Sequence, residues 1–168
     1  APPKGARLDS MTAMLVQLGV SRLVLLDTRR SVTEPRTGKL QRLQRVVLES
    51  CKQCGRAWSM DIEGQTPLAS ALTEAASPSS VRLLATPQGP PRHDLPLTLH
   101  GATQAGVLIG PEGGFTVEEQ RAARDAGYEP WALGASIMRI ETAATAAAAV
   151  LGWALEKPQP SPPTAGPL

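Results

Sequence analysis

Two short turns hold most of the residues in this sequence whose types and spacing could do chemistry. The first, Gly-Pro-Glu-Gly-Gly-Phe, spans residues 110–115, and the second, Leu-Gly-Ala-Ser-Ile-Met-Arg-Ile-Glu-Thr-Ala, spans residues 133–143. Each follows a short apolar run and precedes a helical pattern. Two such turns close together put clusters of backbone N–H and C=O groups at one end of a sheet, where open α/β sheets bind their ligands. We therefore expect a binding site there.

The composition of the first turn disfavours a phosphate as the ligand. Pro111 stiffens it, and its glycines let a ligand approach the main chain, although Gly113 and Gly114 could simply supply positive φ to a tight chain reversal. The carboxylate of Glu112 would repel the anion that such N–H groups otherwise attract. Neither G-x-G-x-x-G nor a Walker A sequence occurs. A neutral or cationic adenosine-bearing ligand such as S-adenosylmethionine suits this turn better.

In the second turn, backbone groups are the expected ligand contacts, because the apolar side chains are interpreted as core residues: Leu133, Ile137 and Met138. Arg139 precedes a helix whose face is almost entirely alanine, so we take it as the candidate for chemistry or substrate placement. The alternative is an ion pair with Glu141 or Glu112. Glu141 and Thr142 lie where a helix is expected to begin, so helix capping is a sufficient explanation for both.

The composition is that of one globular domain with no strong preference for a partner. The chain has 168 residues, 42% of them apolar, and its net charge of +2 permits contact with RNA without arguing for it. Cys51 and Cys54 form a lone C-x-x-C with no second Cys or His pair, which disfavours zinc and predicts two helical thiols in a reducing cytosol. No apolar stretch approaches ~18 residues, the length that spans a bilayer.

The hydrophobic pattern alternates strands and helices. Strands are expected at 22–27, 81–85, 105–109 and 130–133. Helices are expected at 10–18 behind a capping Asp9, 39–54, 66–76 opening on Thr66-Pro67, 116–127 with a Thr116/Glu119 capping box, and 142–156. Five prolines in residues 157–168 predict a disordered tail. This alternation implies an α/β fold whose parallel sheet is flanked by helices on both faces.

The two turns, in this order and at this spacing, resemble the RsmE family of ribosomal RNA uridine-N3 methyltransferases in the knotted SPOUT superfamily. Further similarity lies in Pro3-Lys4-Gly5, Leu18-Gly19-Val20, Arg30-Ser31-Val32, and Glu49 with Gln53-Cys54-Gly55-Arg56. The resemblance covers most of residues 1–156 and implies a SPOUT domain there, with a C-terminal trefoil knot. It also implies S-adenosylmethionine as cofactor, small-subunit ribosomal RNA as substrate, a homodimer and a cytoplasmic location, with no metal and no membrane.

The resemblance also implies the site residues. The expected cofactor contacts come from three loops: Leu84, Ala85 and Thr86; Gly110, Pro111, Glu112, Gly113 and Gly114; and Leu133, Gly134, Ile137, Met138 and Thr142. The catalytic candidates are Arg139 and Glu141, and the RNA-binding candidates are Arg30 and Arg56. Methyl transfer to N3 of uracil requires that the imide proton be removed or the developing anion stabilised, and Glu141 and Glu112 are the candidates for the base.

The chain departs from the family's pattern in three places. Gln17 stands where glutamate is usual, and Ser136 stands where arginine is frequent. The sequence also starts where the family's N-terminal RNA-binding barrel of the PUA type should end, so we expect that barrel to have been removed or to be natively absent. These departures leave open a catalytically silent RNA-binding or ribosome-assembly factor on the same scaffold, or an oligomeric domain that binds a small nucleoside.

Overall fold

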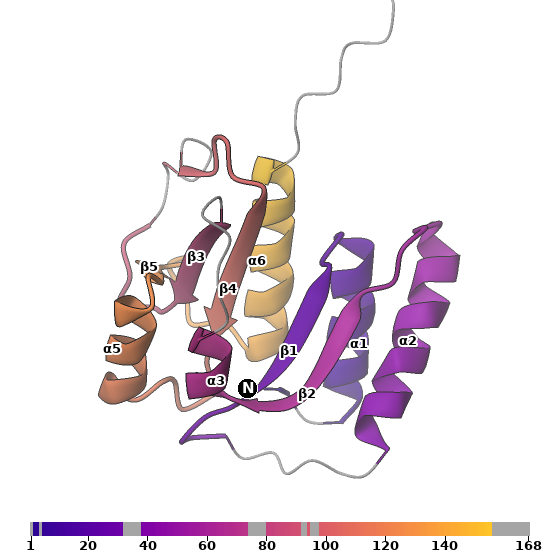
Figure 1. Cartoon of the computed structure of the whole chain (residues 1–168), viewed down its shortest axis with the longest axis horizontal. Coiled ribbons are helices and arrows are strands. Elements are labelled where there is room, and N and C mark those ends of the chain that lie inside the picture. The colour runs from indigo at the N-terminus through magenta and orange to yellow at the C-terminus, as the bar shows by residue number, and fades with distance from the viewer. Residues whose placement is uncertain are drawn as a thin grey trace, which may run out of the picture.

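The computed structural model describes residues 2–3, 5–31, 38–73, 80–91, 94 and 98–155, so the predicted tail lies outside the described residues. Helices and strands alternate along most of the described chain (Figure 1). The helices are α1 (Ala6–Gln17), α2 (Lys39–Cys54), α3 (Leu68–Thr73), α5 (Val117–Asp125) and α6 (Ile140–Leu155). The strands are β1 (Arg22–Asp27), β2 (Asp61–Pro67), β3 (Ser80–Ala85), β4 (Gln104–Ile109) and β5 (Glu129–Trp131).

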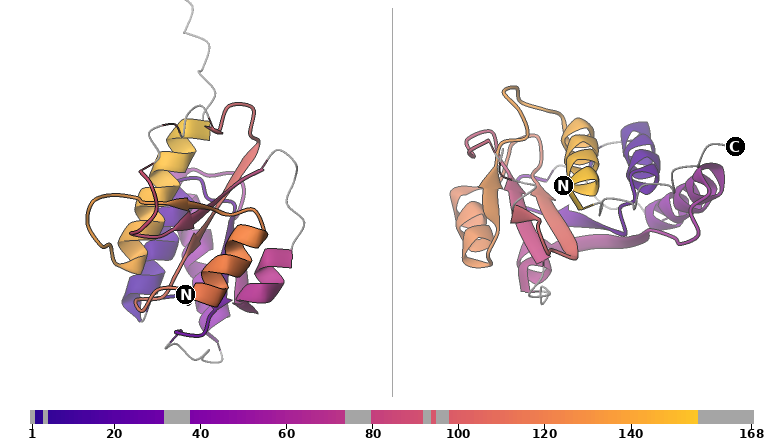
Figure 2. Two further views of the ribbon diagram at one scale, coloured as in Figure 1. Left: turned by 90° about the vertical axis from the view of Figure 1, so that its left-hand side faces the viewer. Right: turned by 90° about the horizontal axis from the view of Figure 1, so that it is seen from above.

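The strand pairings that join these elements are all parallel, which confirms the predicted α/β class. β1 pairs with β2 in a two-stranded sheet, and β3 lies between β4 and β5 in a three-stranded sheet. The single sheet that the sequence predicted is therefore divided in two, because no ladder joins β1 or β2 to the other described strands. Seen from above, α1, α2 and α6 cover one face of the strands, while α3 and α5 lie against the other (Figure 2). No helix in the described part of the chain is long and apolar enough to cross a bilayer.

Alternating side chains of the strands supply the two faces of the core. In β3, Leu83 packs with Ala147 of α6, whereas Leu84 packs on the opposite side with residues of α3 and α5. In β1, Leu25 and Leu26 divide in the same way. Both leucines of β3 are fully buried, and such burial stabilises a fold by about 1.5–3 kcal/mol per side chain. This two-sided burial explains why β1 has a continuous apolar run at residues 23–26 instead of an alternating pattern.

Several elements have the bounds that their patterns predict. Those of β1 and α2 agree at both ends, and those of β3, β4 and β5 differ by one or two residues. The capping box at the start of α5 is present: the Thr116 hydroxyl accepts from the Glu119 N–H at 3.2 Å, and the Glu119 carboxylate accepts from the Thr116 N–H at 2.8 Å. Gly127 then adopts φ 83° directly after the helix. Strong local signals in the sequence were therefore enough to predict where these elements lie.

Two helix starts were predicted too late. α1 begins at Ala6, not residue 10, so Asp9 is not its cap but lies in the first turn, where it pairs with Arg42 of α2 at 3.0 Å. α6 begins at Ile140, not residue 142, so Thr142 lies inside the helix. In both cases a polar residue near a helix start was mistaken for its cap.

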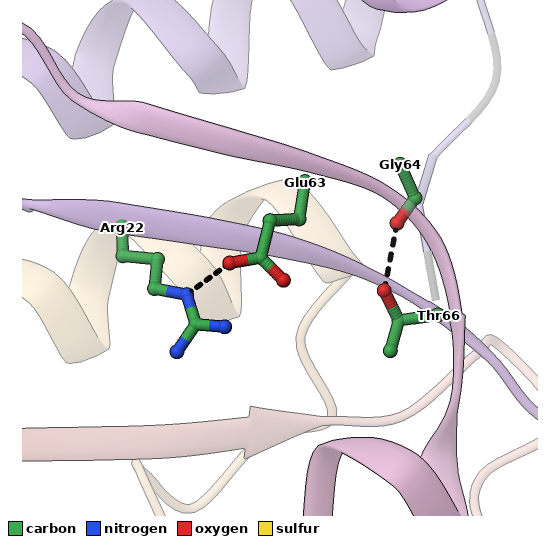
Figure 3. Close-up of polar contacts among 4 residues, drawn as sticks. All are labelled: Arg22, Glu63, Gly64 and Thr66. Atoms are coloured by element: carbon green, nitrogen blue, oxygen red, sulfur yellow. Dashed lines mark hydrogen bonds and ion pairs between the residues drawn. The ribbon is translucent and has the colours of Figure 1, made fainter. Parts of the chain in front are cut away.

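The strand β2 was not predicted, and Thr66 and Pro67 end this strand instead of opening a helix. Its sequence, Asp-Ile-Glu-Gly-Gln-Thr-Pro, is mostly polar, which an edge strand tolerates better than a central one. Gly64 is an extra residue in the pairing with β1, a bulge at which the Gly64 carbonyl accepts from the Thr66 hydroxyl at 3.1 Å (Figure 3). Before the bulge, Arg22 of β1 pairs with Glu63 of β2 (Figure 3). The long-range pairing with β1 therefore overrides a weak local pattern.

Candidate functional site

Strand register brings three loops to one edge of the sheet. Ala85, the last residue of β3, pairs with Ile109 at the end of β4 and with Trp131 at the end of β5. The loop after residue 85 and the turns at 110–114 and 133–139 therefore leave the sheet at the same level. Ile140 at the start of α6 packs against the same core cluster as Ile109, so the end of the second turn returns to the first. The three predicted cofactor loops therefore meet at the carboxyl edge.

The loop after β3 lies directly on the chain that leaves β5. The Thr86 N–H donates to the Trp131 carbonyl at 3.0 Å, and the Ala132 N–H donates to the Pro90 carbonyl at 3.0 Å. A Cβ added at Gly89 would lie 2.7 Å from the Trp131 nitrogen, closer than real Cβ atoms come. Only glycine therefore allows this approach, a requirement that the sequence alone did not reveal.

The first turn is held by its own main chain and by a buried ring. The Gly114 N–H donates to the Pro111 carbonyl at 2.8 Å, and Gly114 has φ 67°. Gly113 does not have positive φ, so only one of the two glycines serves the reversal as predicted. A Cβ at Gly110 would lie 3.1 Å from the ring of Phe115, which is buried in the core. Gly110 is therefore needed, at least in part, for packing.

The second turn is largely open to solvent. Residues 134–137 are all exposed, and Ile137 has an exposed fraction of 86%, which contradicts the prediction of a core side chain there. Leu133 does pack against the core, and Met138 is half-buried, its terminal methyl 3.0 Å from where a Cβ on Gly134 would lie. Main-chain groups and one apolar side chain are thus available beside the first turn.

Arg139 is exposed, and no hydrogen bond or ion pair joins its side chain to another described residue. The alternative of an ion pair with Glu141 or Glu112 is therefore wrong, because Glu141 pairs with Arg7 of α1 at 3.5 Å. The Arg139 carbonyl accepts from the Ala143 N–H at 2.8 Å, which fixes its backbone at the start of α6. The guanidinium is left available to a ligand.

The two RNA-binding candidates both hold carbonyl groups of the chain itself. Arg56 donates to the Val16 carbonyl at 2.9 Å and the Gly19 carbonyl at 3.4 Å, and its guanidinium lies 5.4 Å from the centre of the Trp58 ring. It thereby ties the segment after α2 to the end of α1. Arg30 donates to the Gly113 carbonyl at 2.6 Å, within the first turn. Contact of either side chain with RNA stays a prediction.

Charged groups gather where α5 begins beside the 28–31 loop. The pKa of Glu118 is held below its ordinary value by hydrogen bonds from the backbone N–H of Glu118 and from Thr116, and the charges of Arg29 and Arg30 act in the same direction.

No three metal-binding side chains cluster in the parts of the chain that the structure describes. Cys51 and Cys54 are free thiols on α2, as their helical spacing predicted.

This arrangement suits a ligand that carries a flat base and few negative charges. Among the described residues other than its chain neighbours, no heavy atom lies within 4 Å of where a Cβ on Gly114 would be. The backbone of the second turn is exposed, so main-chain groups of both turns are accessible. The exposed Ile137 offers apolar contact to an aromatic ring. The adenosine part of S-adenosylmethionine requires groups of these kinds, so the residues present fit that cofactor.

Comparison with known proteins also points to S-adenosylmethionine as the ligand. The sequence model of a family described as an RNA methyltransferase domain matches residues 1–152. Proteins named ribosomal RNA small subunit methyltransferase E include one from Synechocystis, 31% identical over 164 residues, which are 93% of this chain and 52% of the relative. Another, from Helicobacter pylori, is 33% identical over 67% of this chain and 47% of its own length. The chain thus spans about half the length of these relatives.

Two solved structures have the same fold and a bound cofactor. A putative methyltransferase from Legionella pneumophila in complex with S-adenosylmethionine has a TM-score of 0.80 at 29% identity, covering 90% of this chain and 62% of that one. A ribosomal RNA small subunit methyltransferase E from Neisseria gonorrhoeae bound to S-adenosylmethionine has a TM-score of 0.79 at 28% identity, covering 88% and 61%.

Proposed function

This chain belongs to the family of RNA methyltransferase domains, and on that premise we propose that it uses S-adenosylmethionine to methylate N3 of a uridine in small-subunit ribosomal RNA. The observation that carries the proposal is the meeting of three glycine-bearing loops at one edge, with accessible main chain in both turns. The substrate class is taken from the names of the relatives. The proposal places the protein in the cytoplasm, where its ribosomal RNA substrate is.

The bound cofactor would supply an electrophilic methyl group on a positively charged sulfur. The chain's own contribution is to hold the adenosine and amino acid parts through backbone groups of the 110–114 and 133–138 segments. With the methyl group placed against N3 of the base, proximity removes much of the barrier. When N3 gives up its proton, the negative charge shared by N3 and the uracil oxygens would be stabilised by the guanidinium of Arg139.

Of the two candidate bases, Glu112 is the freer. Its side chain is exposed on the first turn, and no hydrogen bond or ion pair joins it to another described residue. Glu141 is only 17% exposed and is held by Arg7. We therefore assign proton removal to Glu112 and give Glu141 the role of fixing α1 against the start of α6.

The proposal includes the homodimer and the trefoil knot that the resemblance implies. The dimer is supported by exposed apolar side chains on α1 and α6: Met14, Val150 and Trp153. The knot is supported by the course of the chain, which leaves β5 at one side of β3 and β4 and returns so that α6 packs beside α1 (Figure 1).

Two measurements test the function in order. Isothermal titration calorimetry with S-adenosylmethionine should show saturable binding. Incubation with methyl-labelled cofactor and small-subunit RNA should then produce N3-methyluridine in the digested RNA. Binding of RNA without methyl transfer would instead support a silent assembly factor, and binding of cofactor without RNA would support a nucleoside-binding domain.

A further inference from the structure

The loop after β1 is a compact turn whose end lies against the first cofactor turn. The Thr28 N–H donates to the Ser31 hydroxyl at 3.0 Å, the two hydroxyls lie 2.8 Å apart, and the Ser31 N–H donates to the Thr28 carbonyl at 3.0 Å. Thr28 itself is buried. The loop therefore presents Arg29 and Arg30 from a fixed backbone.

Arg30 makes the direct connection to the cofactor turn. Its guanidinium donates to the Gly113 carbonyl at 2.6 Å, a bond between residues 83 positions apart. A Cβ added at Gly113 would lie 3.3 Å from the Arg30 Cδ, so the arginine side chain also covers this glycine. A charged donor on the Gly113 carbonyl fixes the direction of the peptide plane that leads into Gly114.

Glu119 makes the second connection with a single carboxylate. One oxygen accepts from the Arg29 N–H at 2.8 Å, and the other accepts from the Thr116 N–H at 2.8 Å. The same side chain thus caps α5 and holds the 28–31 loop beside the residues that follow the cofactor turn. Arg30 therefore holds the turn itself at Gly113, and Glu119 holds Thr116, two residues after the turn.

We propose that Arg30 and Glu119 are positioning residues that hold the 110–114 turn in its cofactor-binding shape, and that Arg30 serves the cofactor site instead of contacting RNA. The inference rests on the proposed function. Arg30 is exposed, so its bond adds little to global stability, whereas a loosened turn changes the direction of the backbone groups that meet the ligand. Arg29 is the natural comparison, because its side chain has no hydrogen bond to another described residue.

The experiment compares Arg30→Gln with Arg29→Gln, which removes the same charge from the same loop. Calorimetric titration with S-adenosylmethionine should show Kd raised roughly tenfold by Arg30→Gln, the loss expected for a hydrogen bond from a charged donor, and changed less than about twofold by Arg29→Gln. Arg30→Lys should restore part of the affinity. In steady-state assays, Arg30→Gln should raise KM for the cofactor more than KM for RNA, with the melting temperature little changed.

Glu119→Gln is the second test variant. Because it removes a negative charge, it cannot weaken an electrostatic attraction between the protein and RNA phosphate. It should weaken cofactor binding as Arg30→Gln does. Unchanged cofactor affinity with weaker RNA binding in Arg30→Gln would overturn the inference and restore the RNA role. Equal losses in Arg29→Gln and Arg30→Gln would also overturn it, because charge alone would then explain both. Failure of the unaltered chain to bind cofactor overturns the proposed function as well, whereas the other two results leave that function standing.

Discussion

Arg139 lies exposed at the start of α6, and its guanidinium has no partner among the described residues. Because no described residue depends on this side chain for a hydrogen bond or ion pair, Arg139→Ala should leave the melting temperature and cofactor affinity nearly unchanged. Methyl transfer should fall about a hundredfold, the usual effect of losing one electrostatic contact of ~3 kcal/mol in a transition state. Arg139→Lys should recover part of the rate, since it keeps the charge and loses the planar fork. A large drop in melting temperature would contradict this assignment.

Gly110 and Gly134, one in each glycine-bearing turn, should respond differently to replacement by valine. At Gly134 the added Cβ meets only the flexible end of Met138, so Gly134→Val should abolish cofactor binding while the protein unfolds at its usual temperature. At Gly110 the added atoms press on the buried ring of Phe115, so Gly110→Val should also lower the melting temperature. Calorimetric titration and thermal unfolding of both variants separate the two effects. Equal destabilisation of the two variants would mean that Gly134, like Gly110, is needed for packing.

Among the elements, α5 offers a direct test of its capping box. Thr116→Ala removes the hydroxyl that accepts the Glu119 N–H and should lower the free energy of unfolding by about 1 kcal/mol. Thr145→Ala is the matched control, because its hydroxyl bonds back to the Glu141 carbonyl within α6, and alanine is the better helix former. This control should be neutral or slightly stabilising. Urea denaturation measures the free energy of unfolding of both variants. A similar loss in the two would contradict a stabilising capping box at the start of α5.

At the scale of the whole molecule, α6 presents small residues and one large aromatic side chain to solvent. Trp153 is 71% exposed, and Ala149 and Val150 are exposed beside it. A second copy would bury this surface, so light scattering should give about twice the chain mass of 17.7 kDa. Trp153→Ser should yield monomers, while Trp58→Ser, at a 63% exposed position after α2, should not change the mass. A monomeric unaltered chain across micromolar concentrations would show the dimer to be wrong.

Local patterns in the sequence were enough to predict much of the fold and the two turns from which the site is proposed to be built. Continuous apolar residues predicted β1, periodic ones predicted α2, and the Thr116/Glu119 spacing predicted a capping box that the structure contains. The two glycine-bearing turns were predicted to lie together at one end of a sheet, and the parallel register brings them to one edge. These features depend on residues a few positions apart, so their physical causes are visible in the chain itself.

Contacts between distant positions were decided only by the tertiary structure. β2 is a strand because β1 pairs with it, despite its polar sequence. Arg30 and Glu119 reach partners 83 and 90 positions away, and Ile137 is exposed although its type predicts burial. No spacing in the sequence encodes such bonds, because hydrogen bonding and burial are satisfied by whichever groups the fold brings near. The sequence alone therefore predicted which turns lie together, and the folded chain determined which of their side chains bond to other described residues and which do not.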